Sequence, residues 1–212
     1  KAQSLIDWAF QKILFLLILV TSQISIYGQK QFVNKAYDFQ IQEPEKWIEA
    51  NNSELLKNLE KFELDEENLS KLISNNKGSL LLTSFYKYNP KTHAGLIPTI
   101  QINIRLKSGN NFEQFKSVIT ESSKSFKKYF EDFTYIIEPN EIEISGIRSV
   151  YFVGKFTMKT QNGQEMKVRS RTYAIPYKNY FFQLNFTDGQ TGEDCNEEFD
   201  KLVKTIKIGK NK

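Results

Sequence analysis

The chain has 212 residues, of which 29 are Lys or Arg and 25 are Asp or Glu, so its formal net charge is +4. This length suits one domain with a sizeable core, and such a mild charge balance argues against a nucleic-acid partner. One cysteine and one histidine exclude an intramolecular disulfide, His/Cys zinc sites and the usual Ser–His and Cys–His hydrolase arrangements, apart from one that uses the single histidine itself.

The first 28 residues are predicted to be a secretory signal peptide with a short upstream extension. Lys12 precedes an apolar run at 13–20, and small and polar residues follow up to Gly28. The run is shorter than the ~20 residues that span ~30 Å of hydrocarbon. We therefore expect cleavage after Gly28, a single mature domain at 29–212 and a periplasmic or secreted location, with membrane contact only through the signal segment. An uncleaved N-terminal anchor and a buried core helix remain alternatives, whereas the glutamine at the cleavage point argues against a lipoprotein.

Hydrophobic periodicity predicts a mixture of strands and helices in the first part of the mature chain. The clearest strand alternates isoleucines at 100, 102 and 104 with polar residues between them. A strand also follows from the alternation before Glu43-Pro44, and Asn and Asp residues provide helix N-caps. In chain order, the expected elements are a strand at 37–41, helices that begin at Ser53 and Asp65, strands at 80–88 and 99–106, and a helix from Asn110-Asn111 to Phe130.

Period-two alternation dominates from Phe133 onward and predicts antiparallel strands joined by hairpin turns. The strongest turn signal is Gln161-Asn162-Gly163. A last helix is expected to begin near Thr191, with acids in its first turn and lysines in its last, as the helix dipole favours. The expected strands are 134–138, 141–145, 147–159, 165–175 and 180–187. This order predicts an α+β fold on a meandering antiparallel sheet rather than a doubly wound nucleotide-binding fold.

Four short motifs follow one another along the mature chain. Tyr37-x-Phe39-x-Ile41 leads to Pro44-x-x-Trp47, residues 98–104 read Pro-Thr-Ile-Gln-Ile-Asn-Ile, strands through 171–173 and 180–186 come next, and Phe199-x-x-Leu202 lies near the end. In this order the motifs resemble the superfamily of PsbP-like, MOG-type Ran-binding and DcrB-like proteins, here as an exported, Bacteroidetes-like variant. The resemblance implies a six- or seven-stranded antiparallel sheet flanked by helices, a PsbP-like α/β/α sandwich. It also implies a binding or assembly role rather than catalysis, and it carries over no ligand residue or cofactor.

Polar, basic and aromatic side chains alternate with core positions on several strands and suggest a binding face. They occur at 99–105, at 167–173 and at 183–187. If they line one surface, that surface suits an anionic small molecule, a glycan or a protein partner. The alternative is an ordinary solvent-facing side of an antiparallel sheet, partly covered by a helix. The candidate binding residues are Arg105, Tyr151, Lys155, Arg169, Arg171 and Tyr173.

The remaining chemically reactive side chains are interpreted as structural. His93 lies in a turn-rich loop without a neighbouring carboxylate, and Cys195 lies on the apolar stripe of the last helix, where a reactive thiol is the alternative. The acids at 188–198 are interpreted as helix caps because they lack the spacing of a calcium loop. No metal site, cofactor or catalytic residue is predicted.

The sequence therefore predicts an exported, non-catalytic binding or assembly protein of the cell envelope. Its partner is expected to be a protein or an anionic small molecule. An envelope hydrolase that uses sheet-rim carboxylates, such as Glu138, Glu141 and Glu143, is one alternative. A membrane-anchored structural protein, with the signal segment uncleaved, is the other.

Overall fold

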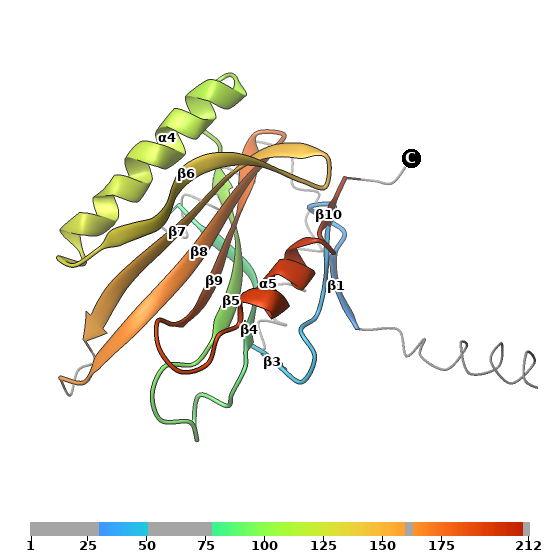
Figure 1. Cartoon of the computed structure of the whole chain (residues 1–212). Coiled ribbons are helices and arrows are strands. Elements are labelled where there is room, and N and C mark those ends of the chain that lie inside the picture. The colour runs from blue at the N-terminus through green and yellow to red at the C-terminus, as the bar shows by residue number, and fades with distance from the viewer. Residues whose placement is uncertain (1–29, 51–77, 160–162, 210–212) are drawn as a thin grey trace, which may run out of the picture. The chain divides into compact units, whose positions relative to one another are not determined.

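The computed structural model describes residues 30–50, 78–159 and 163–209, and its strands form two antiparallel sheets (Figure 1). The larger sheet has seven strands in the order β3-β4-β5-β9-β8-β7-β6, and the smaller has the order β1-β2-β10. The strands of the larger sheet are β3 (Ile48–Glu49), β4 (Leu80–Tyr86), β5 (Thr99–Leu106), β6 (Thr134–Ile144), β7 (Ile147–Lys159), β8 (Glu165–Tyr177) and β9 (Tyr180–Gly189). Those of the smaller sheet are β1 (Gln31–Asn34), β2 (Phe39–Gln42) and β10 (Lys207–Ile208).

Some predicted features lie outside the described residues. They are the signal segment, the helices expected to begin at Ser53 and Asp65, and the first two residues of the 161–163 turn. No helix within the described ranges is long and apolar enough to cross a membrane.

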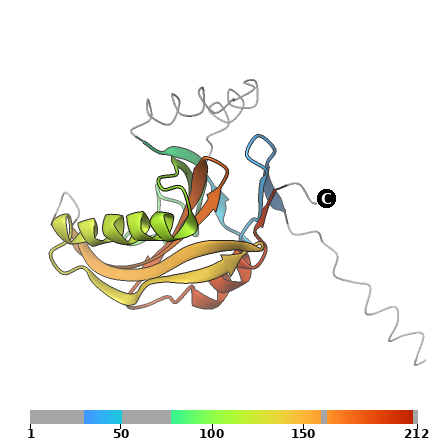
Figure 2. The same ribbon diagram turned by 90° about the horizontal axis from the view of Figure 1, so that it is seen from above.

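Two helices cover opposite faces of the larger sheet (Figure 2). On one face, α4 (Phe112–Lys124) begins at Asn111, whose side chain accepts a hydrogen bond from the backbone of Gln114 and so caps the helix. On the other face, α5 (Asn196–Val203) packs Phe199 against Phe186 of β9, with ring centroids 5.2 Å apart. The predicted α+β architecture, a seven-stranded antiparallel sheet between helices, is confirmed.

The main core lies between the larger sheet, α5 and the smaller sheet. Ile100, Ile102 and Ile104 of β5 are fully buried there, as their alternation predicts. Phe39 of β2 contacts Phe182 of β9 at a ring distance of 4.8 Å, which joins the two sheets. A second cluster joins α4 to the opposite face of the larger sheet. The larger sheet therefore buries apolar side chains on both faces, under one helix on each.

Both helices are shorter than the sequence predicts. The predicted helix up to Phe130 ends at Lys124 and continues as the 3₁₀ turn η1 (Ser125–Lys128), although Phe126 and Phe130 still pack inward. The last helix begins at Asn196 instead of Thr191. Gly192 adopts a φ of 89°, a left-handed conformation that a right-handed helix cannot contain.

The strands also differ from the prediction in their boundaries, and the two-residue strands β3 and β10 were not predicted. The two strands predicted on either side of Pro139 are one strand, β6, with register shifts between Tyr135 and Asn140. A proline is tolerated here because β6 is an edge strand and its ladder is irregular. The short strand β1 was not predicted, and the chain between β1 and β2 turns through Asp38, whose φ is 52°.

Candidate functional site

The sheet register divides the six predicted binding residues between the two faces of the larger sheet. Residues that lie directly opposite each other in an antiparallel pair project to the same side. Arg105 lies opposite Phe181, whose ring packs on Phe115 of α4 at 5.4 Å, so Arg105 is on the α4 face. Arg171 lies opposite Phe186, which packs on α5, so it is on the other face. The prediction of one common face is therefore wrong, because alternation within a strand does not determine its phase relative to another strand.

Five of the candidates share the α5 face, but most of them are enclosed. Tyr151 stacks on Tyr173 with ring centroids 4.7 Å apart, and Tyr173 is only 3% exposed. Arg171 is also 3% exposed, whereas Lys155, opposite Arg169 in the register, is exposed. These side chains form packing and ion-pair contacts rather than an open surface, and a binding role for them stays a prediction.

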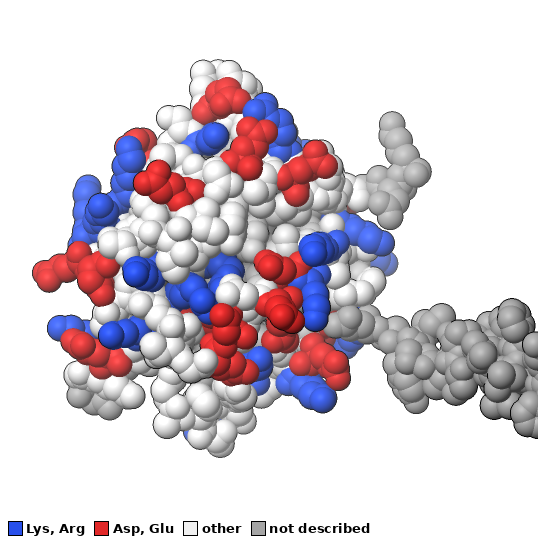
Figure 3. All heavy atoms as spheres, viewed as in Figure 1, with Lys and Arg blue, Asp and Glu red and all other residues white. Residues whose placement is uncertain are grey.

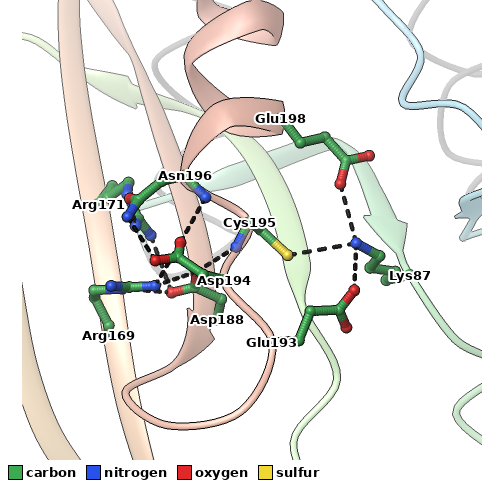
Figure 4. A network of polar contacts seen from close by, with 9 residues as sticks. All are labelled: Lys87, Arg169, Arg171, Asp188, Glu193, Asp194, Cys195, Asn196 and Glu198. Atoms are coloured by element: carbon green, nitrogen blue, oxygen red, sulfur yellow. Dashed lines mark hydrogen bonds and ion pairs between the residues drawn. The ribbon is translucent and has the colours of Figure 1, made fainter.

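The two arginines of this group belong to a buried ion network (Figure 4). Asp188 of β9 is fully buried and accepts two hydrogen bonds from the Arg169 guanidinium, from Nε at 2.9 Å and from Nη2 at 2.8 Å. It also accepts hydrogen bonds from Arg171 at 3.0 Å and from the backbone N–H of Cys195 at 3.1 Å. One carboxylate therefore joins β8, β9 and the segment that enters α5.

A second carboxylate extends this network to the first residue of α5. Asp194 accepts from the backbone N–H of Asn196 at 2.8 Å and from Arg169 at 3.0 Å. These contacts hold the pKa of Asp194 below its ordinary value. The side chain of Asn196 in turn accepts a hydrogen bond from Arg171. The network thus fixes where α5 begins, which is a structural role.

Lys87 forms the other half of the cluster in Figure 4. Its Nζ lies 2.7 Å from Glu193, 3.1 Å from Glu198 and 3.6 Å from the sulfur of Cys195. Burial lowers the pKa of Lys87, but the hydrogen bonds to the two glutamates outweigh it, and the net shift is upward. Burial raises the pKa of Cys195 to about 11, so the thiol is protonated at neutral pH. A buried, protonated thiol is a poor nucleophile, which supports the prediction of a packed cysteine.

His93 is exposed, as predicted, but it has an aromatic neighbour. Its ring stacks on Tyr88 at 4.5 Å between ring centroids, and the Tyr88 hydroxyl donates a hydrogen bond to Glu193 at 2.5 Å.

Within residues 30–50, 78–159 and 163–209, no three His, Cys, Asp or Glu side chains lie close enough together to hold a metal ion. On the face shown in Figure 3, basic and acidic side chains are interleaved.

The sequence did not reveal a cavity of about 720 Å³ between α4 and the sheet. Its apolar wall comes from α4, the following turn and strands β7, β8 and β9: Phe115, Ile119, Phe126, Phe152, Ala174 and Phe181. Its polar lining includes Arg105, Ser122 and Gln183. The small side chains Ala174 and Thr172 among large aromatic ones were the available signal, because they leave space unfilled.

Arg105 is the cation of this cavity. It is exposed, and its Nη1 donates to Oε1 of Gln183 at 3.1 Å. Among the described residues it forms no ion pair. The carboxylate that lines the cavity, Glu121, is occupied by Lys124 at 2.6 Å. The cavity therefore combines an apolar wall with a positive charge that has no carboxylate partner in the described part of the chain.

A second, shallower hollow of about 680 Å³ contains carboxylates. There Asp132 accepts from both the backbone and the hydroxyl of Thr157, which lowers the pKa of Asp132. Glu165 pairs with Lys159 at 3.3 Å. On β6, Glu141 accepts from Arg148 at 2.6 Å, and this hydrogen bond lowers its pKa. A glycosidase-type general acid needs a raised pKa, and the pKa values of Asp132 and Glu141 are shifted in the opposite direction.

Neither a protein-family model nor a curated protein matches the chain. Among solved structures, cyanobacterial PsbP (CyanoP) from Synechocystis sp. PCC 6803 superposes with a TM-score of 0.50 over 88% of this chain and 96% of that one. The chain has a PsbP-like fold. The sequence identity is 8%, so the similarity concerns the fold and does not transfer a function. The resemblance predicted from the motifs is confirmed at that level.

Two other solved structures are similar at lower scores. A protein from Bacteroides thetaiotaomicron has a TM-score of 0.47 and 15% identity over 85% of this chain. The chain spans about half the length of that protein, 48%. LpqN of Mycobacterium tuberculosis, described as involved in cell envelope biogenesis, has a TM-score of 0.40 and 15% identity over 62% of this chain and 78% of that one.

Proposed function

We propose that the protein is an exported, non-catalytic binding protein that holds a small molecule in the cavity between α4 and the sheet. The observation that carries the proposal is the cavity itself, at about 720 Å³. Small-molecule sites are typically clefts of roughly 300–1,000 Å³ with apolar walls and a few polar groups. Export rests on the predicted signal segment at 1–28, which would bring the protein to the periplasm or the medium.

Apolar side chains at the edge of the cavity support this proposal. Val118 of α4 is 40% exposed and Leu106 of β5 is 36% exposed, and both line the cavity. Phe115 and Phe181, deeper in the wall, are 1% and 7% exposed. A ligand that enters would remove the exposed apolar groups from water, which stabilises the complex by roughly 25 cal/mol per Å² of apolar surface.

A neutral fluorescent probe tests the proposal without assuming the head group of the natural ligand. We expect N-phenyl-1-naphthylamine to bind saturably to the purified protein with a rise in fluorescence. Val118→Trp places a large side chain at the edge of the cavity and should weaken binding about tenfold, the effect of losing ~1.4 kcal/mol. Ser117→Trp is the matched control, because Ser117 is exposed on α4 and does not line the cavity.

The two variants must retain the circular dichroism spectrum and thermal stability of the wild type. Equal weakening by both substitutions would mean that the probe binds elsewhere on α4. The absence of saturable binding to the wild type would contradict the proposal.

The alternatives have less support from the geometry. For a hydrolase at the sheet rim, the carboxylates described above are engaged in hydrogen bonds or ion pairs. Turnover on glycan, ester or peptide panels would overturn the assignment as a non-catalytic protein. For a protein partner on the α5 face, Lys155→Glu is a suitable test because Lys155 is exposed. Charge reversal at Arg169 or Arg171 would instead break the buried network around Asp188.

The third alternative is a membrane-anchored structural protein with an uncleaved signal segment. N-terminal sequencing of the exported product distinguishes a cleaved signal, with a start at Gln29, from such an anchor.

A further inference from the structure

We propose that the occupant of the α4 cavity is an anionic, single-chain amphiphile. Its carboxylate or phosphate group binds Arg105, and its apolar chain lies between α4 and the sheet. This inference rests on the proposed function, since it names the ligand class of the same cavity. Three features of the cavity support this ligand class: the pairing of the arginines, the orientation of Gln183 and the lining along α4.

Arg105 differs from the other arginines in its lack of a carboxylate partner among the described residues. The chain has arginines at 105, 148, 169 and 171. Arg148 pairs with Glu141 at 2.6 Å and with Glu113 at 2.8 Å. The guanidinium groups at 169 and 171 both pair with the buried Asp188. Within the described parts of the chain, Arg105 is thus the arginine without a carboxylate partner, and it is the one that lines the cavity.

Gln183 holds the Arg105 guanidinium in place without neutralising it. The Gln183 amide nitrogen donates to Asn185 Oδ1 at 3.3 Å, which turns its carbonyl oxygen toward Arg105. A guanidinium carries five N–H donors in a planar fork that matches a carboxylate or a phosphate bidentately. The bond to Gln183 uses Nη1, and the remaining donors can bind an anion.

Much of the lining away from Arg105 is apolar, and Ser123 is already hydrogen-bonded. Phe115 and Ile119 lie on successive turns of α4 and pack with Phe152 in the apolar wall of the cavity. Ser123, two turns beyond Phe115, donates to or accepts from Tyr135 at 2.6 Å and donates to the backbone of Thr120. From Phe115 to Ser123 the helix advances about 12 Å, at 1.5 Å per residue. An extended alkyl chain therefore has an apolar path that starts at the cationic end.

Charge complementarity determines the orientation of the ligand. Glu121, the acidic residue of the lining, is paired with Lys124. The described residues of the lining include one cation, Arg105. A cationic or neutral head group would leave that guanidinium without an anionic partner among the described residues, whereas an anion can pair with it through charge-assisted hydrogen bonds.

The test compares three ligands with the same ten-carbon chain: decanoate, decyl phosphate and 1-decanol. Each displaces the neutral naphthylamine probe from the purified protein at constant ionic strength. We expect the preferred anion to bind about tenfold more tightly than 1-decanol, which corresponds to about 1.4 kcal/mol. Arg105→Gln should remove this difference and leave the affinity for 1-decanol unchanged. Lys107→Gln is the matched control, because it removes the same charge nearby but Lys107 does not line the cavity.

The outcomes separate this inference from the proposed function. Tighter binding of decanoate than of decyl phosphate identifies an acyl carboxylate as the ligand class, and the reverse identifies a phosphate head group. If 1-decanol displaces the probe as well as both anions do, the ligand class assigned here is wrong, although the cavity still binds apolar molecules. An equal loss of anion affinity in Arg105→Gln and Lys107→Gln would show a long-range charge effect and would also overturn it. If the probe itself does not bind, the proposed function fails first.

Discussion

Replacing Asp188 by alanine should destabilise the protein more than any other single substitution of an acidic residue in the described part of the chain. The carboxylate is 0% exposed and accepts hydrogen bonds from Arg169, Arg171 and the backbone of Cys195. Its removal leaves the guanidinium of Arg171, 3% exposed, without a counter-charge. Breaking a buried ion pair by removing one partner costs about 3–5 kcal/mol.

The expected loss is about 4 kcal/mol in the free energy of unfolding. Two contacts keep it from the upper end of the range: Arg169 retains Asp194 at 3.0 Å, and Arg171 retains Asn196. The assay is equilibrium urea unfolding followed by circular dichroism. Asp200→Ala is the matched control, because Asp200 is an exposed residue of α5, and its loss should change stability by less than about 0.5 kcal/mol.

A double replacement tests the electrostatic cause. Asp188→Leu combined with Arg171→Leu removes the two most buried charges of the network and leaves Arg169 paired with Asp194. Apolar replacement of buried ion-pair partners is often neutral. We expect the double variant to be more stable than Asp188→Ala. A loss below about 1.5 kcal/mol in the single variant, or a double variant that is less stable than the single one, would refute the reasoning.

Three further predictions concern buried groups. Tyr37→Phe should raise the free energy of unfolding by about 1 kcal/mol, because the hydroxyl is buried without a hydrogen-bond partner among the described residues; destabilisation in urea would contradict this. Gly154→Ala should cost about 2 kcal/mol, because the added Cβ would lie 2.5 Å from the Phe133 ring; an unchanged melting temperature would show that the ring moves aside freely. Burial raises the pKa of Cys195 from 9.0 to about 11, so the unfolded thiol ionises first and stability from this group is lost as pH rises between those values. Urea unfolding at pH 8 and pH 10 should show a smaller pH dependence for Cys195→Ala than for the wild type, and identical slopes would exclude this linkage.

Local patterns predicted much of the fold because each depends on near neighbours. The alternation of Ile100, Ile102 and Ile104 predicts a strand with one buried face, and all three are 0% exposed. Asn111 predicts the start of a helix and caps α4. The Pro139 region was predicted less well, because a proline interrupts a central strand but is tolerated on an edge strand with an irregular ladder. Whether a strand lies at an edge is decided by its partners.

The candidate site could not be predicted from local patterns, because it depends on which strands pair and which side chains meet after folding. The sequence by itself determined an α+β class, the alternating strands and the residue types available for binding. Only the tertiary structure decided that Arg105 and Arg171 lie on opposite faces, because the side-chain period of two leaves the phase between strands to their pairing. It also decided that Arg171 has a buried carboxylate partner and Arg105 has none among the described residues. The cavity beside Arg105 arises in the same way, because the space between α4 and the sheet depends on side chains that are far apart in the sequence and meet only after folding.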